Sequence, residues 1–371
     1  MVCSDTEAKF IQTIVENIPK YTPIPVEKYL VGVKPRAKDV ESLLSMELDE
    51  VRIVVIHGLP GIGKTTIAKA VYNRIAKYFH RSSFLERVRE TSKTEEGIIK
   101  LQRQLLKEIL GDENLKIHST SKVIKLIKNR LRSKNVLLVL DDVDKLKRIE
   151  KLFGDFNWFT SRSRVIITTA ADPQLLDPLG KVYTTYEVKE LDKHEALQLF
   201  QKHAFPGKKP NEDYFELTNQ VIQYAQGLPL AVVIIARDLC GKTKPKWESA
   251  LHKYNEIPNK DIQQVLEVSY YGLDGNEQDI FLDIACFFKG WTKDYVVDIL
   301  NGCDLFADDG IPRLVDKCLI TVDRYDKLLM HDLIQKMGKE VVRQESTDIL
   351  GKRSRLWHHK DAIEVLIGNK V

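Results

Sequence analysis

Short apolar runs alternate with amphipathic stretches over the first half of the chain. Four runs rich in apolar residues are typical of buried strands: residues 51–56, 83–88, 135–140 and 164–168. Three stretches between them have the apolar spacing of helices: residues 65–78, 97–110 and 122–131. Strands that alternate with helices predict a parallel sheet covered by helices on both faces. We therefore expect an α/β domain over residues 31–186.

The middle of the chain contains few strand-like runs. Four stretches have helical periodicity: residues 193–205, 213–226, 230–240 and 245–252. Gly227 and Gly241 interrupt this pattern, because glycine is a poor helix former and is common where a helix ends. The pattern predicts a small helical domain over residues 187–260.

Two further regions flank these domains. Residues 261–371 are again mostly helical, but residues 320–322 and 327–330 are short apolar runs separated by a polar turn. Helices followed by a small hairpin predict a winged-helix domain over residues 261–371. At the other end, residues 1–30 predict a short helix followed by a linker with three prolines, which cannot continue a helix.

Composition places the chain among folded, water-soluble proteins. Of its 371 residues, 43% are hydrophobic and 30% are charged, and 57 basic against 53 acidic residues give a net charge of +4. This excess is too small to indicate a nucleic-acid or membrane-surface partner. No apolar run reaches the roughly 18–20 residues of a membrane span. The five cysteines lack metal-binding spacing and indicate a reducing compartment, so we expect a cytoplasmic protein, with the nucleus as the alternative location.

The clearest chemical motif joins the first predicted strand to the first predicted helix. It has the form GxxxxGK followed by threonine, the spacing of a P-loop. Its candidate phosphate-binding residues are Gly58, Gly61, Ile62, Gly63, Lys64, Thr65 and Thr66. Glycine permits positive φ angles, so that successive N–H groups can point into one concavity at the N-terminus of the helix, where anions are favoured. Lys64 is expected to reach the terminal phosphates of a nucleotide, and Thr65 to bind Mg²⁺.

A second motif follows the apolar run at residues 135–140. This run delivers Asp141 and Asp142 to the end of a buried parallel strand, which is the arrangement of a Walker B motif. Asp141 is expected to bind Mg²⁺ through water, since Mg²⁺ retains much of its hydration shell. Asp142 is the candidate catalytic residue and would orient a water molecule. The alternative is that one of the two aspartates caps the N-terminus of a helix.

Eight stretches of the sequence occur in the order found in one protein family. They are residues 30–33 (LVGV), 58–66, 84–90 (FLERVRE), 137–144 (LLVLDDVD), 227–230 (GLPL), 281–288 (FLDIACFF), 330–333 (MHDL) and 352–357 (KRSRLW). The chain resembles the nucleotide-binding (NB-ARC) region of plant TIR-type NLR disease-resistance proteins, which is related to the apoptotic protease-activating factors. The resemblance covers nearly all of the chain, from Tyr29 to Val371, and Asp144 is typical of the TIR-type subgroup.

The resemblance implies a site built from all three predicted domains. Val31 and Val33 would line the adenine ring with apolar contacts. Pro229 would close this pocket from the helical domain, and His331 of the winged-helix domain would donate to the β-phosphate of ADP. From the residues alone, the stretch around Pro229 is equally well explained as a helix break, and a lone histidine is more often structural.

The resemblance also implies a molecular switch of plant immunity. ADP would hold the resting state, and exchange to ATP, bound with Mg²⁺, would favour an open form that self-associates. A nucleotide shifts such an equilibrium only by its differential affinity for the two forms. Hydrolysis would be at most a slow reset. The expected partners are TIR and leucine-rich-repeat regions, which we do not find in residues 1–371, or other immune receptors, and no TIR NADase activity is assigned to this chain.

Two other functions compete with this hypothesis. A P-loop ATPase that turns over freely, with the winged helix as an accessory domain, would carry the same two motifs. DNA binding by the winged helix is disfavoured, because residues 261–371 contain no strongly basic recognition helix. The basic stretch at residues 122–134 is typical of a solvated helix face. We therefore do not expect a nucleic-acid partner.

One position departs from the family pattern. Where family members usually have arginine after the fourth strand, this chain has Ala170. The resemblance implies that the arginine senses the γ-phosphate of ATP, which alanine cannot do. A charge-assisted hydrogen bond contributes about 1.5–3 kcal/mol, so its loss predicts a preference for ADP. The neighbouring Arg162 or Arg164 is the alternative source of a guanidinium.

Overall fold

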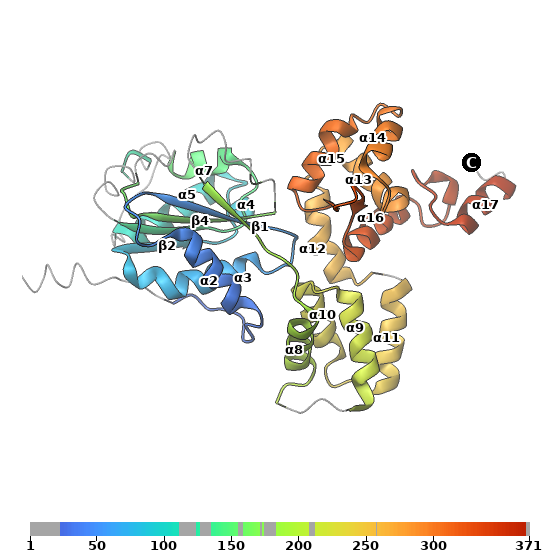
Figure 1. Ribbon diagram of the computed structural model, residues 1–371, viewed down its shortest axis with the longest axis horizontal. Helices are drawn as coiled ribbons and strands as arrows, with labels where there is room; N and C mark the ends of the chain where they lie inside the picture. Colours follow the sequence, from blue (N-terminus) through green and yellow to red (C-terminus); the bar gives the residue numbers. More distant parts are fainter. Residues whose placement is uncertain are drawn as a thin grey trace, which may run out of the picture. The chain divides into compact units, whose positions relative to one another are not determined.

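The computed structural model describes residues 23–110, 124–126, 135–154, 159–170, 173, 183–207, 212–256 and 258–368. The chain forms two units (Figure 1). The first comprises Met1–His57 and Lys64–Val188, and the second comprises Gly58–Gly63 and Lys189–Val371. The loop Gly58–Gly63 therefore packs with the second unit, although the elements that precede and follow it belong to the first.

The first unit contains a five-stranded parallel sheet in the order β2-β3-β4-β1-β5. Its strands are β1 (Arg52–His57), β2 (Arg81–Leu85), β3 (Val136–Leu140), β4 (Arg164–Thr169) and β5 (Tyr183–Glu187). β3 and β4 are buried along their whole length, as expected for strands covered on both faces. The four predicted strands are confirmed with small shifts at their ends. β5 was not predicted, because it lies at the sheet edge and is only partly buried.

Helices cover both faces of this sheet (Figure 1). They are α2 (Val33–Leu44), α3 (Lys64–Ile75), α4 (Val88–Thr91), α5 (Glu95–Leu110) and α7 (Leu146–Phe153). α5 and α7 share one apolar core with Val55, Leu138 and Ile167 of the central strands, and α2 packs with α3 on the opposite face. The predicted P-loop fold, a parallel sheet with helices on both faces, is thus confirmed.

Two predicted helices of this part are described only in fragments or not at all. Of the helix predicted at residues 122–131, residues 124–126 are described and are helical. The short helix predicted within residues 1–30 lies outside the described residues, as does most of the basic stretch at residues 122–134. The helices predicted at residues 65–78 and 97–110 are confirmed as α3, which the 3-10 helix Ala76–Tyr78 follows, and α5.

One fully buried charge anchors the start of β4. The side chain of Arg164 is 0% exposed, and its five N–H groups all donate to backbone carbonyl oxygens. The acceptors are Leu44 (2.6 Å from Nε), Glu50 and Ser163 (2.7 and 3.1 Å from Nη1), and Ser45 and Leu48 (2.7 and 2.8 Å from Nη2). Four of these carbonyls lie between the end of α2 and the start of β1, so Arg164 ties that segment to the sheet. Burial, and secondarily Arg52, lowers the pKa of Arg164.

The second unit begins with four helices. They are α8 (Lys193–Ala204), α9 (Phe215–Ala225), which the 3-10 helix Glu212–Tyr214 precedes, α10 (Pro229–Leu239) and α11 (Lys244–Glu256). The buried indole of Trp247 lies edge-on to the rings of Phe200 and Tyr214 and donates to the carbonyl of Leu239 at 2.8 Å. One side chain thus connects three elements of this bundle and the 3-10 helix. The four predicted helices are confirmed.

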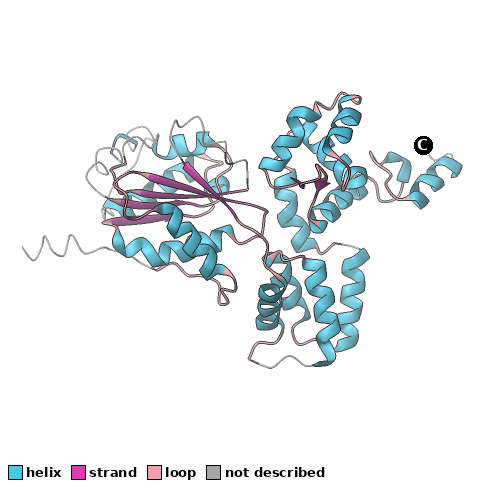
Figure 2. Ribbon diagram, viewed as in Figure 1, coloured by secondary structure: helices cyan, strands magenta, loops and turns pink. Residues whose placement is uncertain are grey.

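Further helices and a hairpin complete the second unit (Figure 2). The helices are α12 (Lys260–Tyr270), α13 (Gly275–Asp283), which continues into the π-helix Ile284–Phe288, α14 (Lys293–Asn301), α15 (Ala307–Asp316), α16 (Asp332–Glu345), the 3-10 helix Leu350–Lys352, and α17 (His359–Gly368). The predicted hairpin is confirmed as the antiparallel pair β6 (Thr321–Val322) and β7 (Leu328–Leu329). No helix in the described part of the chain has the length and apolar character needed to cross a bilayer. The domain boundaries at residues 31, 187 and 261 stay predictions.

Candidate nucleotide-binding site

The loop Gly58–Gly63 connects β1 to the N-terminus of α3. Gly61 has a φ of 76° and Gly63 a φ of 100°, which side chains with a Cβ rarely adopt. Lys64, Thr65 and Thr66 form the first turn of α3, and this turn contains no acidic residue that would oppose an anion. The backbone and the helix dipole therefore favour a phosphate at this turn, as the P-loop spacing predicts.

Gly61 also contacts the helix that begins at Pro229. The N–H group of Leu230 donates to the carbonyl of Gly61 at 3.2 Å. A Cβ atom on Gly61 would lie 2.7 Å from the Cβ of Leu230, so no larger residue fits without a shift. Pro229 is the first residue of α10, where its missing N–H group costs no helical hydrogen bond. The structure thus brings the phosphate-binding loop next to the residue after Pro229.

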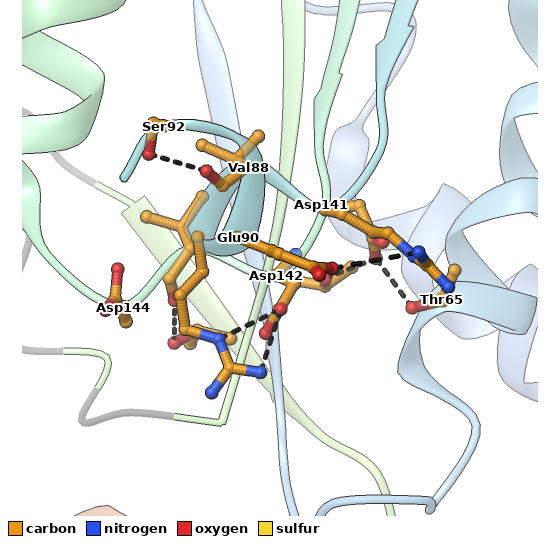
Figure 3. Close-up of polar contacts among 12 residues, drawn as sticks. Thr65, Val88, Glu90, Ser92, Asp141, Asp142 and Asp144 are labelled. Atoms are coloured by element: carbon orange, nitrogen blue, oxygen red, sulfur yellow. Dashed lines mark hydrogen bonds and ion pairs between the residues drawn. The ribbon is translucent and has the colours of Figure 1, made fainter. Parts of the chain in front are cut away.

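Thr65 and Asp141 meet at the carboxyl end of β3 (Figure 3). The hydroxyl groups of Thr65 and Thr168 both donate to Oδ1 of Asp141, at 2.6 and 2.7 Å. The other oxygen, Oδ2, accepts no hydrogen bond from a described residue, although Asp141 is only 4% exposed. A hydroxyl beside a carboxylate with a spare oxygen suits Mg²⁺, which prefers hard oxygen ligands. The residues that the sequence predicts for Mg²⁺ therefore lie together and fit the ion.

Asp142 adopts a backbone conformation that is uncommon outside glycine. Its φ is 59°, and its N–H group donates to the hydroxyl of Thr168 at 2.8 Å. Its Oδ2 accepts a hydrogen bond from Nε of Arg89 at 3.0 Å and lies 3.0 Å from Nη2 of the same guanidinium in an ion pair. Burial raises the pKa of Asp142, and the charge of Asp141 adds to this effect, whereas Arg89 and Lys64 oppose it. The role of Asp142 in orienting water stays a prediction.

The structure does not support the alternative that one of these aspartates caps a helix. The next helix, α7, begins at Leu146, and its N-cap residue is Lys145, without a side-chain capping bond. The carboxylate of Asp141 instead accepts from two threonines, and that of Asp142 pairs with Arg89. Both side chains face polar partners at the edge of the sheet.

Val31 and Val33 lie where the chain enters α2. Val31 is 8% exposed, and Val33, the first residue of α2, is half-buried. The N-cap residue between them, Gly32, has a φ of 70°. The two valines are close in the chain and belong to the first unit, and their contact with adenine stays a prediction.

His331 is the N-cap residue of α16 and contacts the chain just before Pro229. Its Nδ1 accepts from the N–H group of Leu333 at 3.2 Å, so the proton lies on Nε2, which faces the carbonyl of Gln226 at 3.2 Å. The amide of Gln226 also donates to Asp332 at 2.5 Å. Burial lowers the pKa of His331, with a smaller contribution from Lys289, while the Gln226 carbonyl, Glu190 and Asp332 oppose the shift. Its predicted bond to the β-phosphate would replace the bond to Gln226 and stays a prediction.

We expect the chain to lose stability as the pH falls below about 6.5, and His331 to contribute to the loss. Because its folded-state pKa lies below the unfolded value, the contribution is present above about pH 6.5 and is lost as the pH falls through the folded-state pKa. Protonation of Nδ1 would also remove the acceptor for Leu333.

Urea unfolding of the chain and of His331→Asn at about pH 7.5 and about pH 5.5 measures this effect. Asparagine is a good N-cap residue and does not ionise, so the variant should show the weaker pH dependence. Equal dependence in the two proteins would contradict the assignment.

Arg162 and Arg164 do not replace the arginine missing at position 170. Ala170 follows the carboxyl end of β4, whereas Arg164 is the first residue of that strand. All the N–H groups of the Arg164 guanidinium donate to backbone carbonyls. Arg162 precedes the strand and pairs with Asp49 at 3.1 Å. β1 and β4 are parallel, and Arg164 pairs with Arg52 at the amino-terminal ends of these strands. The two arginines therefore lie at the end of the sheet opposite to the phosphate-binding loop, which follows the carboxyl end of β1. The alternative that either of them senses a phosphate is therefore wrong.

Two polar residues of the site were not predicted. Thr168 bridges Asp141 and Asp142, and Arg89 pairs with Asp142. Arg89 lies in a stretch that resembles the family and Thr168 in a predicted strand, but local spacing contains no sign of contacts across 26, 27 or 53 residues. Only the sheet order, which places β3 between β2 and β4, brings them together.

Comparison with known proteins assigns these elements to a family. Residues 36–210 match the NB-ARC domain, and residues 274–346 match the winged-helix domain of Roq1-like disease resistance proteins. The chain belongs to the NB-ARC family of disease-resistance proteins. The NB-ARC match includes the P-loop and the Walker B motif, and the second match includes the hairpin and His331.

Plant resistance proteins are similar to this NB-ARC chain over nearly all of its length. Disease resistance protein RUN1 of Vitis rotundifolia is 45% identical over 342 residues, which cover 92% of this chain and 25% of RUN1. TMV resistance protein N of Nicotiana glutinosa is 38% identical over 374 residues, which cover 98% of this chain and 32% of that protein. The chain thus spans a quarter to a third of the length of these relatives.

A solved structure shares the fold of the NB-ARC chain. The Walker-type ATPase of Pyrococcus abyssi superposes with a TM-score of 0.60 at 13% identity, and the match covers 87% of this chain and 99% of the ATPase. At this identity the likeness concerns the fold alone.

Proposed function

We propose that this chain is the ADP- and ATP-binding switch of a plant intracellular immune receptor, with ADP bound in its resting state. The observation that carries the proposal is the contact between Thr65 of the P-loop helix and Asp141 at the end of β3. It joins the two motifs that hold a nucleotide and its metal, in a chain of the NB-ARC family. Lys64, next to Thr65, would neutralise the terminal phosphates.

Mg²⁺, when bound with ATP, neutralises phosphate charge. Thr65 and Asp141 would hold it, and Thr168 would keep the Asp141 carboxylate in place through its hydroxyl group. Asp142 would orient water for a slow reaction that returns the switch to ADP. The pairing of Asp142 with Arg89 supports slow rather than rapid turnover, because a carboxylate shared with a guanidinium is a weak proton acceptor.

Exchange of ADP for ATP would favour a form of the chain that self-associates. In the resting form, Pro229 would close the adenine pocket and His331 would hold the β-phosphate. The hydrogen bond from Leu230 to Gly61 supports such a coupling, because the phosphate-binding loop cannot move without affecting the start of α10. TIR and leucine-rich-repeat regions, or other immune receptors, are the expected partners.

The nucleotide that co-purifies with the chain tests this function. We expect denatured protein to release ADP in near-equimolar amount, and steady-state phosphate release to be far slower than the 1–100 turnovers per second of typical phosphotransfer enzymes. Lys64→Gln should release little nucleotide. Rapid turnover by the unmodified chain would instead support a free ATPase with an accessory winged helix, and the absence of any bound or exchangeable nucleotide would refute the proposal.

A further inference from the structure

Arg89 is held rigidly against the end of β3, and the proposed function assigns it no contact with the nucleotide. The N–H group of Val88 donates to the carbonyl of Asp141 at 2.8 Å, and that of Arg89 to the carbonyl of Asp142 at 2.9 Å. The guanidinium of Arg89 also contacts Oδ2 of Asp142, through a hydrogen bond from Nε and an ion pair with Nη2. Backbone and side chain of Arg89 are thus both fixed to the residue that follows the Mg²⁺-binding aspartate.

This anchoring leaves one nitrogen of the guanidinium unused. Nη1 of Arg89 donates to no described residue, and 31% of the side chain is exposed. The other arginines nearby differ. All three nitrogens of Arg148 are engaged, by Asp144 and by the hydroxyl of Ser92, and Arg87 is 74% exposed, with Glu90 at 3.7 Å. Arg89 therefore combines a fixed position with spare donor capacity.

The charges around Asp142 indicate what this donor faces. Both Arg89 and the P-loop residue Lys64 act electrostatically on the Asp142 carboxylate. These two cations balance the carboxylates of Asp141 and Asp142. Mg²⁺ held at Asp141 would therefore leave a net positive charge at the carboxyl end of the strands, where Lys64 would bind the terminal phosphates. Ala170, at the end of the neighbouring strand β4, adds no charge. A further phosphate group at this edge would supply the acceptor for Nη1.

We propose that Arg89 distinguishes ATP from ADP in this chain by donating from Nη1 to the terminal phosphate of ATP, with Asp142 as the positioning residue that holds the guanidinium. The inference rests on the proposed function. An arginine beside a transferring or terminal phosphate provides charge-assisted hydrogen bonds that the diphosphate cannot receive. Because Asp142 shares the guanidinium, the discrimination is smaller than that of an unpaired arginine.

Binding of ADP and of the non-hydrolysable β,γ-imido analogue of ATP, each with Mg²⁺, tests this inference on the intact chain after exchange of its bound nucleotide. Arg89→Gln should weaken binding of the ATP analogue about tenfold and change ADP binding less than about threefold. Arg87→Gln is the matched control, since it removes a guanidinium two residues away that has no link to Asp142, and it should change neither affinity. Arg89→Lys retains the charge without the fork and should show an intermediate loss.

The outcomes separate this inference from the proposed function. An unchanged ratio of the two affinities in Arg89→Gln, or equal weakening of both nucleotides, would overturn the role of Arg89 while leaving the nucleotide switch intact. If Arg89→Gln fails to fold, Arg89→Lys decides by the same ratio. Failure of the unmodified chain to bind either nucleotide would overturn the proposed function and this inference with it.

Discussion

Replacing Ala170 by arginine is expected to raise the affinity for ATP relative to ADP by roughly ten- to a hundredfold. Position 170 follows β4 directly, beside β3 and its Asp141 and Asp142. A guanidinium there would gain a charge-assisted hydrogen bond to the third phosphate, at about 1.5–3 kcal/mol, and nothing comparable from ADP. In the proposed switch, a variant that prefers ATP would also self-associate more readily.

Affinities of the chain and of Ala170→Arg for ADP and the ATP analogue measure this effect. Ala170→Gln is the matched control, because it adds a side chain of similar reach without charge, and its ratio should stay within about threefold of the unmodified chain. An unchanged ratio in Ala170→Arg would refute the prediction. Arg162 or Arg164 could not explain an unchanged ratio, because both are bound to other groups at the amino-terminal end of β4. Combining Ala170→Arg with Arg89→Gln separates the two proposed sources of a guanidinium.

The strands and motifs that could be predicted from the sequence are those with a local signal. β3 and β4 are continuous apolar runs because both their faces are covered, and GxxxxGK fixes the loop before α3 by the need for positive φ angles. β5 lacks such a signal, since an edge strand with the sequence YTTYE needs no apolar run. Local pattern thus predicted the buried strands, including the edge strand β2, and missed β5, the edge strand that is only partly buried.

The contacts within the site depend on chain folding over long distances. Arg89 and Asp142 are 53 residues apart, and His331 and Gln226 are 105 apart. The sequence predicted that Thr65 and Asp141 share a metal because two motifs with known chemistry imply it, and their hydroxyl–carboxylate contact agrees. No comparable pattern marked Arg89, Thr168 or Gln226. Their partners follow from strand order and from the turn before α10, which single-sequence periodicity does not contain.

Replacing Arg164 by methionine is expected to lower the free energy of unfolding of the first unit by about 3–5 kcal/mol. Methionine fills much of the same space but donates no hydrogen bond. Five backbone carbonyls would lose their donor, four of them between α2 and β1. A buried acceptor left unsatisfied costs about 1–3 kcal/mol, and water can replace the guanidinium only at the outer carbonyls. The loss should therefore be among the largest for any single residue of the sheet.

Hydrogen exchange of the amides in β1 and β4 measures this loss in the first unit without assuming that the whole chain unfolds in one step. Arg162→Met is the matched control: it removes the same side chain two residues earlier, where an exposed pair with Asp49 contributes at most about 1 kcal/mol. Similar losses in both variants would show that the buried hydrogen bonds of Arg164 contribute no more stability than the exposed ion pair of Arg162. A large loss confined to Arg164→Met would show that a buried arginine, at the edge of the sheet opposite to the nucleotide, holds the segment that leads into the P-loop strand.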